Sequence, residues 1–189
     1  MAEFKAPLMD EKKEGKEAKK RKFHSPVDIE EAEVKKLEPE DAEEVCKVMQ
    51  KCLFAVTEKE VGDVLELGMS YGAFVGRMLV AVGLGWAVHY NPESLEIESG
   101  EENAVFLEDD AVLLPYEGKG LREMLIGHRE KAAKGEGLSY AVTITSPTNP
   151  DGSVNEIVMQ RGTKTEKVLM KMDYKFFKTP KGVLALKRL

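Results

Sequence analysis

The segment with the clearest chemical potential is Val112–Leu121, where an apolar run meets the glycine pair Gly118-Lys119-Gly120. Glycine lets the backbone come close to a ligand, and the first amide groups of a following helix have no helical partner. Those amides and the helix dipole favour an anion, so the segment is a candidate phosphate-binding turn, to which Lys119 adds positive charge. The other interpretation is that the glycines only shape the turn. The spacing matches neither a P-loop nor the three-glycine dinucleotide motif.

Three consecutive acids, Glu108, Asp109 and Asp110, precede this turn by a few residues. On a strand, Glu108 and Asp110 would point to one face and Asp109 to the other. A carboxylate held close to a reacting group can accept a proton from it, so Glu108 and Asp110 are candidate general bases. The alternative is that the strand end is exposed and the acids are simply hydrated.

Histidine and cysteine have no metal-binding spacing in this chain. His24, His89 and His128 are far apart, and neither a His-Glu-x-x-His nor a Cys-x-x-Cys pattern occurs. We therefore expect no metal site. Cys46 and Cys52 follow an apolar helical pattern, which favours positions in the core.

The turn and the acids need elements to hold them, and hydrophobic periodicity predicts these elements. Pro39 and its neighbouring acids indicate a helix start, and Thr57 with Glu60 forms a capping box for a second helix. Met78–Val88 is nearly all apolar, which is typical of a strand at the centre of a sheet. We predict helices at 39–53, 57–67, 118–134 and 153–161, and strands at 34–37, 73–75, 78–88, 104–114, 139–145, 167–172 and 183–188.

The predicted order is strand, helix, helix, three strands, helix, strand, helix, two strands. Helices that interleave with a mixed sheet in this way indicate the α/β or α+β class. Polar loops are expected at 91–103 and 146–152, with Ser153 capping the last helix and Gly162 ending it.

Two stretches of the chain resemble the GNAT N-acetyltransferase family. Leu107–Val112 followed by Tyr116–Leu121 resembles the acetyl-CoA-binding strand and loop of that family, and Val34–Val45 resembles its first strand and helix. The predicted element order also agrees with the GNAT order from Glu33 to Leu189. The resemblance implies a divergent member with a mixed, mostly antiparallel central sheet flanked by helices.

Three positions differ from the family's pattern. The loop written Gln/Arg-x-x-Gly-x-Gly/Ala falls on residues 117–122, where Gly120 matches but Glu117 and Arg122 replace the usual residues. A carboxylate at 117 would repel phosphate if it pointed there, whereas Arg122 would either clash with the cofactor or supply positive charge. The family's tyrosine acid, four residues before a glycine that corresponds to Gly162, falls on Val158.

The resemblance implies transfer of an acetyl group from acetyl-CoA, used as a co-substrate, to an amine of a small molecule or protein by direct attack. Glu108 or Asp110 would activate that amine. The residues implied to bind the pantetheine are Ala111, Val112 and Leu113, and those implied to bind the pyrophosphate are Gly118, Lys119, Gly120, Leu121 and Arg122. The alternative function is a catalytically silent GNAT-fold module that binds CoA or regulates a partner.

Charge divides the 189 residues into two parts. Residues 1–30 hold eight basic and seven acidic side chains, and the remaining 159 residues carry a net charge of −7. We predict a disordered tail at 1–30 and one GNAT-like domain at 31–189. The acidic domain would favour a cationic acceptor and argues against nucleic acid, apart from weak contact through Lys19–Lys22.

The sequence also indicates where the chain works. It has two cysteines, no stretch of about 20 apolar residues and no apolar signal core, so we expect a cytoplasmic protein without a membrane partner. Whether it forms a homodimer stays open at this point.

Overall fold

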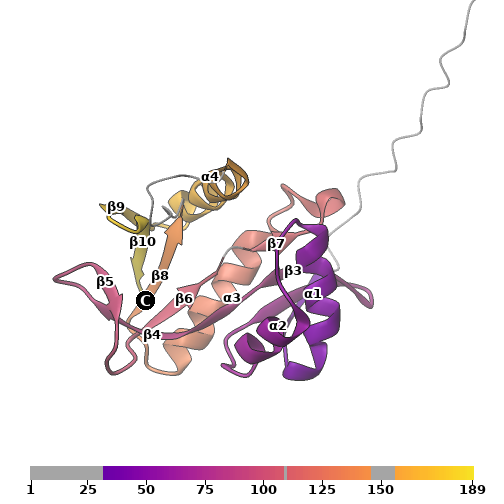
Figure 1. The fold of residues 1–189 in the computed structure, drawn as a ribbon, viewed down its shortest axis with the longest axis horizontal. Helices are drawn as coiled ribbons and strands as arrows, with labels where there is room; N and C mark the ends of the chain where they lie inside the picture. The colour runs from indigo at the N-terminus through magenta and orange to yellow at the C-terminus, as the bar shows by residue number, and fades with distance from the viewer. Residues whose placement is uncertain (1–31, 109, 146–155) are drawn as a thin grey trace, which may run out of the picture.

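The computed structural model describes residues 32–108, 110–145 and 156–189, and within 156–163 it describes the backbone only. The predicted tail, Asp109 and the loop at 146–152 with Ser153 therefore lie outside the described residues. Strands form the centre of the molecule, and helices flank them (Figure 1). The elements in chain order are β1 (Ala32–Lys36), η1 (Pro39–Asp41), α1 (Ala42–Lys51), α2 (Glu58–Leu65), β2 (Tyr71–Val75), β3 (Met78–Gly83), β4 (Gly85–Asn91), β5 (Glu96–Glu98), β6 (Ala104–Leu107), β7 (Ala111–Val112), η2 (Leu114–Tyr116), α3 (Leu121–Gly135), β8 (Tyr140–Thr145), α4 (Glu156–Lys171), β9 (Lys175–Thr179) and β10 (Gly182–Arg188).

The strands form two sheets rather than one. The first has the order β1-β2-β3-β7, and the second has the order β5-β4-β6-β8-β10-β9. Only β6 and β8 pair in parallel; every other pairing among the described strands is antiparallel. The predicted mixed, mostly antiparallel sheet is therefore confirmed.

The predicted strand at 78–88 is wrong as a single element, because it divides at Leu84. Met78–Gly83 pairs with β2 and β7, whereas Gly85–Asn91 pairs with β5 and β6. The predicted strand at 104–114 divides in the same region into β6 and β7, and Pro115 then lies in η2. The apolar run carries no sign of the division at Leu84, since the residues on both sides are buried. The second division falls at the acids 108–110, which interrupt the other apolar run.

These divisions open the sheet between β6 and β8. Their parallel register runs from Ala104 opposite Tyr140 to Phe106 opposite Val142. Beyond Phe106 the chain turns to β3, where Ala111 lies opposite Val82, while the end of β8 pairs with β10. Two neighbouring strands thus separate toward their carboxyl ends, where a ligand can reach backbone groups.

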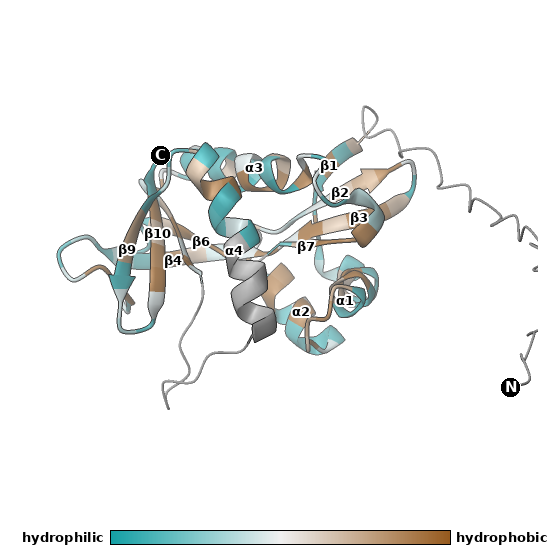
Figure 2. Ribbon diagram, turned by 90° about the horizontal axis from the view of Figure 1, so that it is seen from above, coloured by the Kyte–Doolittle hydropathy of each residue, from teal (hydrophilic) through white to brown (hydrophobic). Residues whose placement is uncertain are grey.

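Helices cover both faces of the first sheet, β1-β2-β3-β7 (Figure 2). On one face, α1 and α2 bury Val45, Met49, Val61 and Leu65 against β3. On the other, α3 buries Leu121 and Leu125 in a cluster with Val80 and Val112. The glycine turn is therefore held between a buried strand and a buried helix face.

Helix α2 begins as the sequence predicts. The Thr57 side chain accepts a hydrogen bond from the Glu60 amide, and the Glu60 carboxylate accepts one from the Thr57 amide at 2.8 Å. The Thr57 amide and the Thr57 hydroxyl both donate to the Glu60 carboxylate, and these hydrogen bonds lower the pKa of Glu60 because they favour its charged form.

The prediction for the C-terminal third is wrong in one respect. Residues 167–172 belong mainly to α4, which runs past Gly162 to Lys171, and the following strand is Lys175–Thr179. Thr165 and Leu169 are both buried and lie four residues apart, so the apolar pattern is helical.

The predicted loop at 91–103 also contains the short strand β5. In the described part of the chain, no helix is both long enough and apolar enough to cross a bilayer.

Candidate functional site

The glycine turn has the geometry of an anion site. Gly118 and Gly120 both have positive φ angles, of 74° and 84°, in the left-handed region that favours glycine. A Cβ on either residue would meet no described atom within 4 Å, so the space above the turn is open. Helix α3 begins at Leu121, and its first intrahelical bond runs from the Met124 amide to the Gly120 carbonyl. The amides of residues 121–123 therefore have no helical carbonyl to bind, and they point outward from the N-terminal end of α3.

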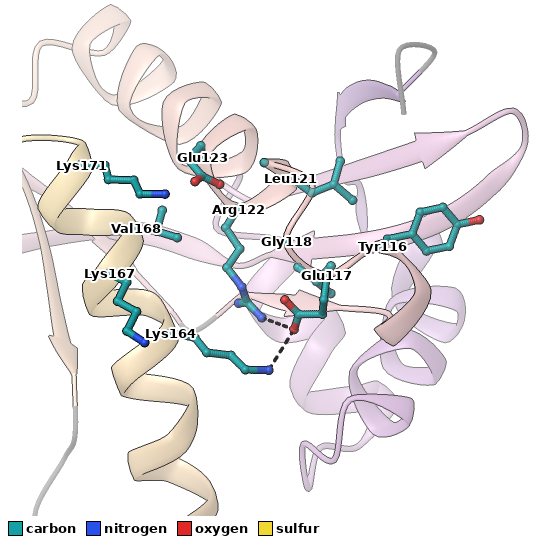
Figure 3. Close-up of a pocket in the computed structure, with 12 residues that line it drawn as sticks. Tyr116, Glu117, Gly118, Leu121, Arg122, Glu123, Lys164, Lys167, Val168 and Lys171 are labelled. Carbon is teal, nitrogen blue, oxygen red and sulfur yellow. Dashed lines mark hydrogen bonds and ion pairs between the residues drawn. The ribbon is translucent and has the colours of Figure 1, made fainter. Parts of the chain in front are cut away.

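This turn forms one side of a cavity of about 430 Å³, and α4 forms the other (Figure 3). Among the lining residues are four cations and two carboxylates, a local excess of positive charge in an acidic domain. Lys167 and Lys171 form no ion pair within the described residues. The charged residues of this lining are Glu117, Arg122, Glu123, Lys164, Lys167 and Lys171.

The two loop residues that differ from the family's pattern bind each other. Arg122 donates from Nη2 to the Glu117 carboxylate at 2.8 Å, and Lys164 lies 3.5 Å from the same oxygen. The Arg122 side chain is only 12% exposed. The negative charge at 117 is therefore balanced by two cations, and Figure 3 shows this cluster between the turn and α4.

Backbone groups of β7 are available at the opening between β6 and β8. The Leu113 amide donates to the Val80 carbonyl at 3.0 Å, so the polar groups of Leu113 point toward β3. Because successive residues of a strand alternate, those of Val112 point toward the opening. Arg122 donates from Nη1 to the Asp110 carbonyl on the same side, and thus reaches from the turn to the strand.

The Asp110 carboxylate is held in a buried ion pair. Its Oδ1 accepts from Nη2 of Arg129, whose side chain has no exposed area. Arg129 also donates to the Leu84 carbonyl at 2.6 Å and to the Glu108 carbonyl at 3.3 Å. Gly83 makes room for this group, since a Cβ there would lie 2.6 Å from Asp110 Oδ1. Arg129 thus binds the chain at the points where both predicted long strands divide.

The structure brings together most, but not all, of the predicted site residues. Those that line the cavity at the turn are Val112, Gly118, Gly120, Leu121 and Arg122. Asp110 lines a second cavity beside it, whereas Glu108 is half-buried and lines neither.

Three other predicted residues lie close to the site without lining either cavity. Ala111 is buried, Leu113 packs toward α1, and the Lys119 ammonium lies 5.9 Å from the centre of the Tyr116 ring. The side chain of Val158, which holds the position of the family's tyrosine acid, is outside the described residues.

Sequence reasoning missed two parts of the site. The first is the face of α4 that carries Lys164, Lys167 and Lys171, whose spacing of three and four residues is itself a helical signal. The second is Arg129, which follows Leu121 and Leu125 at four-residue intervals. A charged residue on such an apolar stripe indicates a buried partner.

Neither His89 nor His128, the two histidines within the described residues, lines either cavity. His89 Nδ1 lies 2.6 Å from the Glu101 carbonyl, and His128 Nδ1 lies 2.9 Å from the Met124 carbonyl. Within the described ranges, no three His, Cys, Asp or Glu side chains are grouped so that they could hold a metal ion.

Solved GNAT structures resemble this chain over most of its length at low sequence identity. The GNAT domain of S. lividans PAT is 15% identical with a TM-score of 0.62, covering 84% of this chain and 90% of that one. A GNAT acetyltransferase from Brucella melitensis in complex with acetyl-CoA is 15% identical with a TM-score of 0.54, covering 84% and 88%.

The chain has the GNAT fold. A third neighbour, the ribosomal-protein-S18-alanine N-acetyltransferase from Escherichia coli, is 13% identical with a TM-score of 0.58, covering 84% of this chain and 92% of that one. No protein-family model and no curated protein sequence matches the chain. The GNAT fold thus agrees with the resemblance in the glycine turn, although overall identity to these structures is low.

Proposed function

We propose that this chain is a divergent GNAT N-acetyltransferase, which transfers an acetyl group from acetyl-CoA to an amine. The observation that carries the proposal is the turn Gly118–Arg122, which presents helix amides to a cationic cavity beside the opening between β6 and β8. A pyrophosphate would bind these amides and the lysines of α4. The pantetheine would lie along the Val112 edge of β7.

The second cavity is the proposed place of the acceptor. It measures about 340 Å³ and shares Val112, Glu117, Arg122 and Lys164 with the first, so the two adjoin along one wall. An amine there would attack the thioester carbonyl of acetyl-CoA. A C–N bond forms and the C–S bond breaks, while the amine loses a proton and the departing thiolate gains one.

Asp110 and Glu108 remain the proposed carboxylates for that proton transfer. Asp110 is the better placed of the two, because it lines the second cavity and Arg129 holds it in one position. Glu108 would act from outside both cavities through water. The E. coli neighbour is named for an alanine of ribosomal protein S18 and another neighbour for agmatine, so protein and small-molecule amines are both candidate acceptors.

A silent CoA-binding module is the second candidate. It is favoured by the Glu117–Arg122 ion pair, which forms part of the wall between the two cavities. Transfer of an acetyl group from one cavity to the other would have to cross this wall. We further propose a cytoplasmic location, for which the low cysteine content is the only support.

Incubation of the full chain with acetyl-CoA and a mixture of amines distinguishes the two candidates. We expect mass spectrometry to find acetylated amine and CoA in equal amounts. Asp110→Asn should reduce the rate by about 100-fold or more at a temperature where circular dichroism shows the variant to be folded, since the change also leaves Arg129 without its buried partner. Saturable CoA binding without any acetylated product would instead support the silent module. A rate that Asp110→Asn leaves unchanged would remove Asp110 from the mechanism.

A further inference from the structure

The second cavity has an apolar rim that an amine-binding site does not require. Leu53 and Leu114 both line it, and 71% and 84% of their surfaces are exposed. Phe54 also lines this cavity and is half-buried. Leucines this exposed gain little from folding, and both stand at the entrance of one cavity.

Leu53 also has an unfavourable backbone conformation. Its φ is +67°, in the left-handed region. The Leu53 amide donates to the Gln50 carbonyl and the Phe54 amide to the Met49 carbonyl, which is the hydrogen-bond pattern that closes many helices. Glycine usually occupies this position, because a side chain is strained there. The chain thus keeps a strained leucine and exposes it to water, and strain of this kind clusters at functional sites.

Charge in the second cavity does not favour a polycation. The carboxylates in its described lining are Asp110 and Glu117, and each already has an ion-pair partner, Arg129 for the first and Arg122 with Lys164 for the second. Lys51 adds one more ammonium group to the same lining. A second positive charge on the acceptor would therefore meet cations, despite the acidity of the whole domain.

We propose, building on the acetyltransferase function above, that the acceptor is a small primary amine carried on an apolar chain or ring. Its amino group would lie near Asp110 and the shared wall, where the thioester is expected. Its apolar body would pack against Leu53, Phe54 and Leu114. The cationic acceptor that the net charge of the domain favours would then carry a single positive charge.

The test compares 2-phenylethylamine with spermidine as acceptors of the full chain. We expect a higher kcat/KM for phenylethylamine, and we expect Leu53→Gly and Leu114→Ser each to lower it by about fivefold, the loss of roughly one apolar contact. Both variants should bind acetyl-CoA as the wild type does. Leu67→Ser is the matched control, since Leu67 is also exposed but lies outside the cavity.

Leu53→Gly also separates a binding role from a structural one. It removes backbone strain, so its melting temperature should rise while its use of phenylethylamine falls. A preference for spermidine, or unchanged phenylethylamine kinetics in both cavity variants, would overturn the proposal.

Calorimetric titration with phenylethylamine alone decides the case if acetyl-CoA fails to bind. Failure with acetyl-CoA would count against the acetyltransferase function only. Phenylethylamine binding that Leu53→Gly weakens and Leu67→Ser does not would still support an apolar amine site, and no binding would overturn it.

Discussion

Single residues explain how a divergent loop keeps the geometry of its glycine turn. Glu117 and Arg122 each differ from the family's pattern, and each balances the other's charge through a contact of 2.8 Å. Positive φ angles at Gly118 and Gly120 preserve the turn between them. Arg129 stabilises the neighbouring strand ends, because its guanidinium binds the Asp110 carboxylate and the backbone carbonyls of Leu84 and Glu108.

Arg129→Met should strongly destabilise the fold. The change leaves the Asp110 carboxylate buried without its cation, which costs about 3–5 kcal/mol when one partner of a buried pair is removed. Urea unfolding measures this loss. Lys47→Met is the control, because the Lys47–Glu43 pair is exposed and its loss should shift the midpoint very little. A midpoint for Arg129→Met equal to that of Lys47→Met would contradict a central role for this ion pair.

At the scale of elements, α4 completes the site that the glycine turn begins. Its lysines at 164, 167 and 171 face the turn across the cavity, as Figure 3 shows. Tyr174, two residues beyond Met172, anchors the chain after this helix by donating to Glu130 of α3 at 2.7 Å. Burial and the nearby carboxylate raise the pKa of Tyr174 far above its usual value, so it remains a donor.

Lys167→Ala and Lys171→Ala should each weaken acetyl-CoA binding by about two- to fivefold, as expected for exposed charges facing a phosphate. The loss should shrink as salt is added. Titration calorimetry at two salt concentrations measures both effects. Lys131→Ala is the matched control, since Lys131 is exposed on α3 and does not line the cavity. Equal losses in all three variants would mean that only net charge matters.

Short-range signals in the sequence predicted elements well, and long-range contacts decided the rest. The capping box at Thr57 and the glycine turn depend on neighbours within a few residues, and both are confirmed. At the division, the Leu84 carbonyl accepts a hydrogen bond from Arg129, which is 45 residues away. The apolar stripe of α3 indicates that Arg129 is buried, but no local pattern identifies Leu84 as its partner. Residues 167–172 have a run of apolar side chains that suits a strand or a buried helix, and packing of Leu169 selects the helix.

The whole molecule shows why net charge is a weak guide to ligands. The chain has a formal charge of −6, yet the cavity at the turn has twice as many cations as carboxylates. Two adjoining cavities share one wall, which is built from β7, the turn and α4. On this account the sheet opening admits the thioester, and the wall separates its phosphate end from the acceptor.

Calorimetric titration of acetyl-CoA into the full chain and its Glu117→Gln variant tests the phosphate site most directly. We predict saturable binding with one site per chain. Glu117→Gln should tighten acetyl-CoA binding by about three- to tenfold. Arg122 and Lys164 would then bind phosphate without first breaking their ion pairs with the Glu117 carboxylate. Glu123→Gln, which removes a charge from the same cavity but not from the pair, should change it less. The absence of binding at millimolar acetyl-CoA, or weaker binding by Glu117→Gln, would contradict the account.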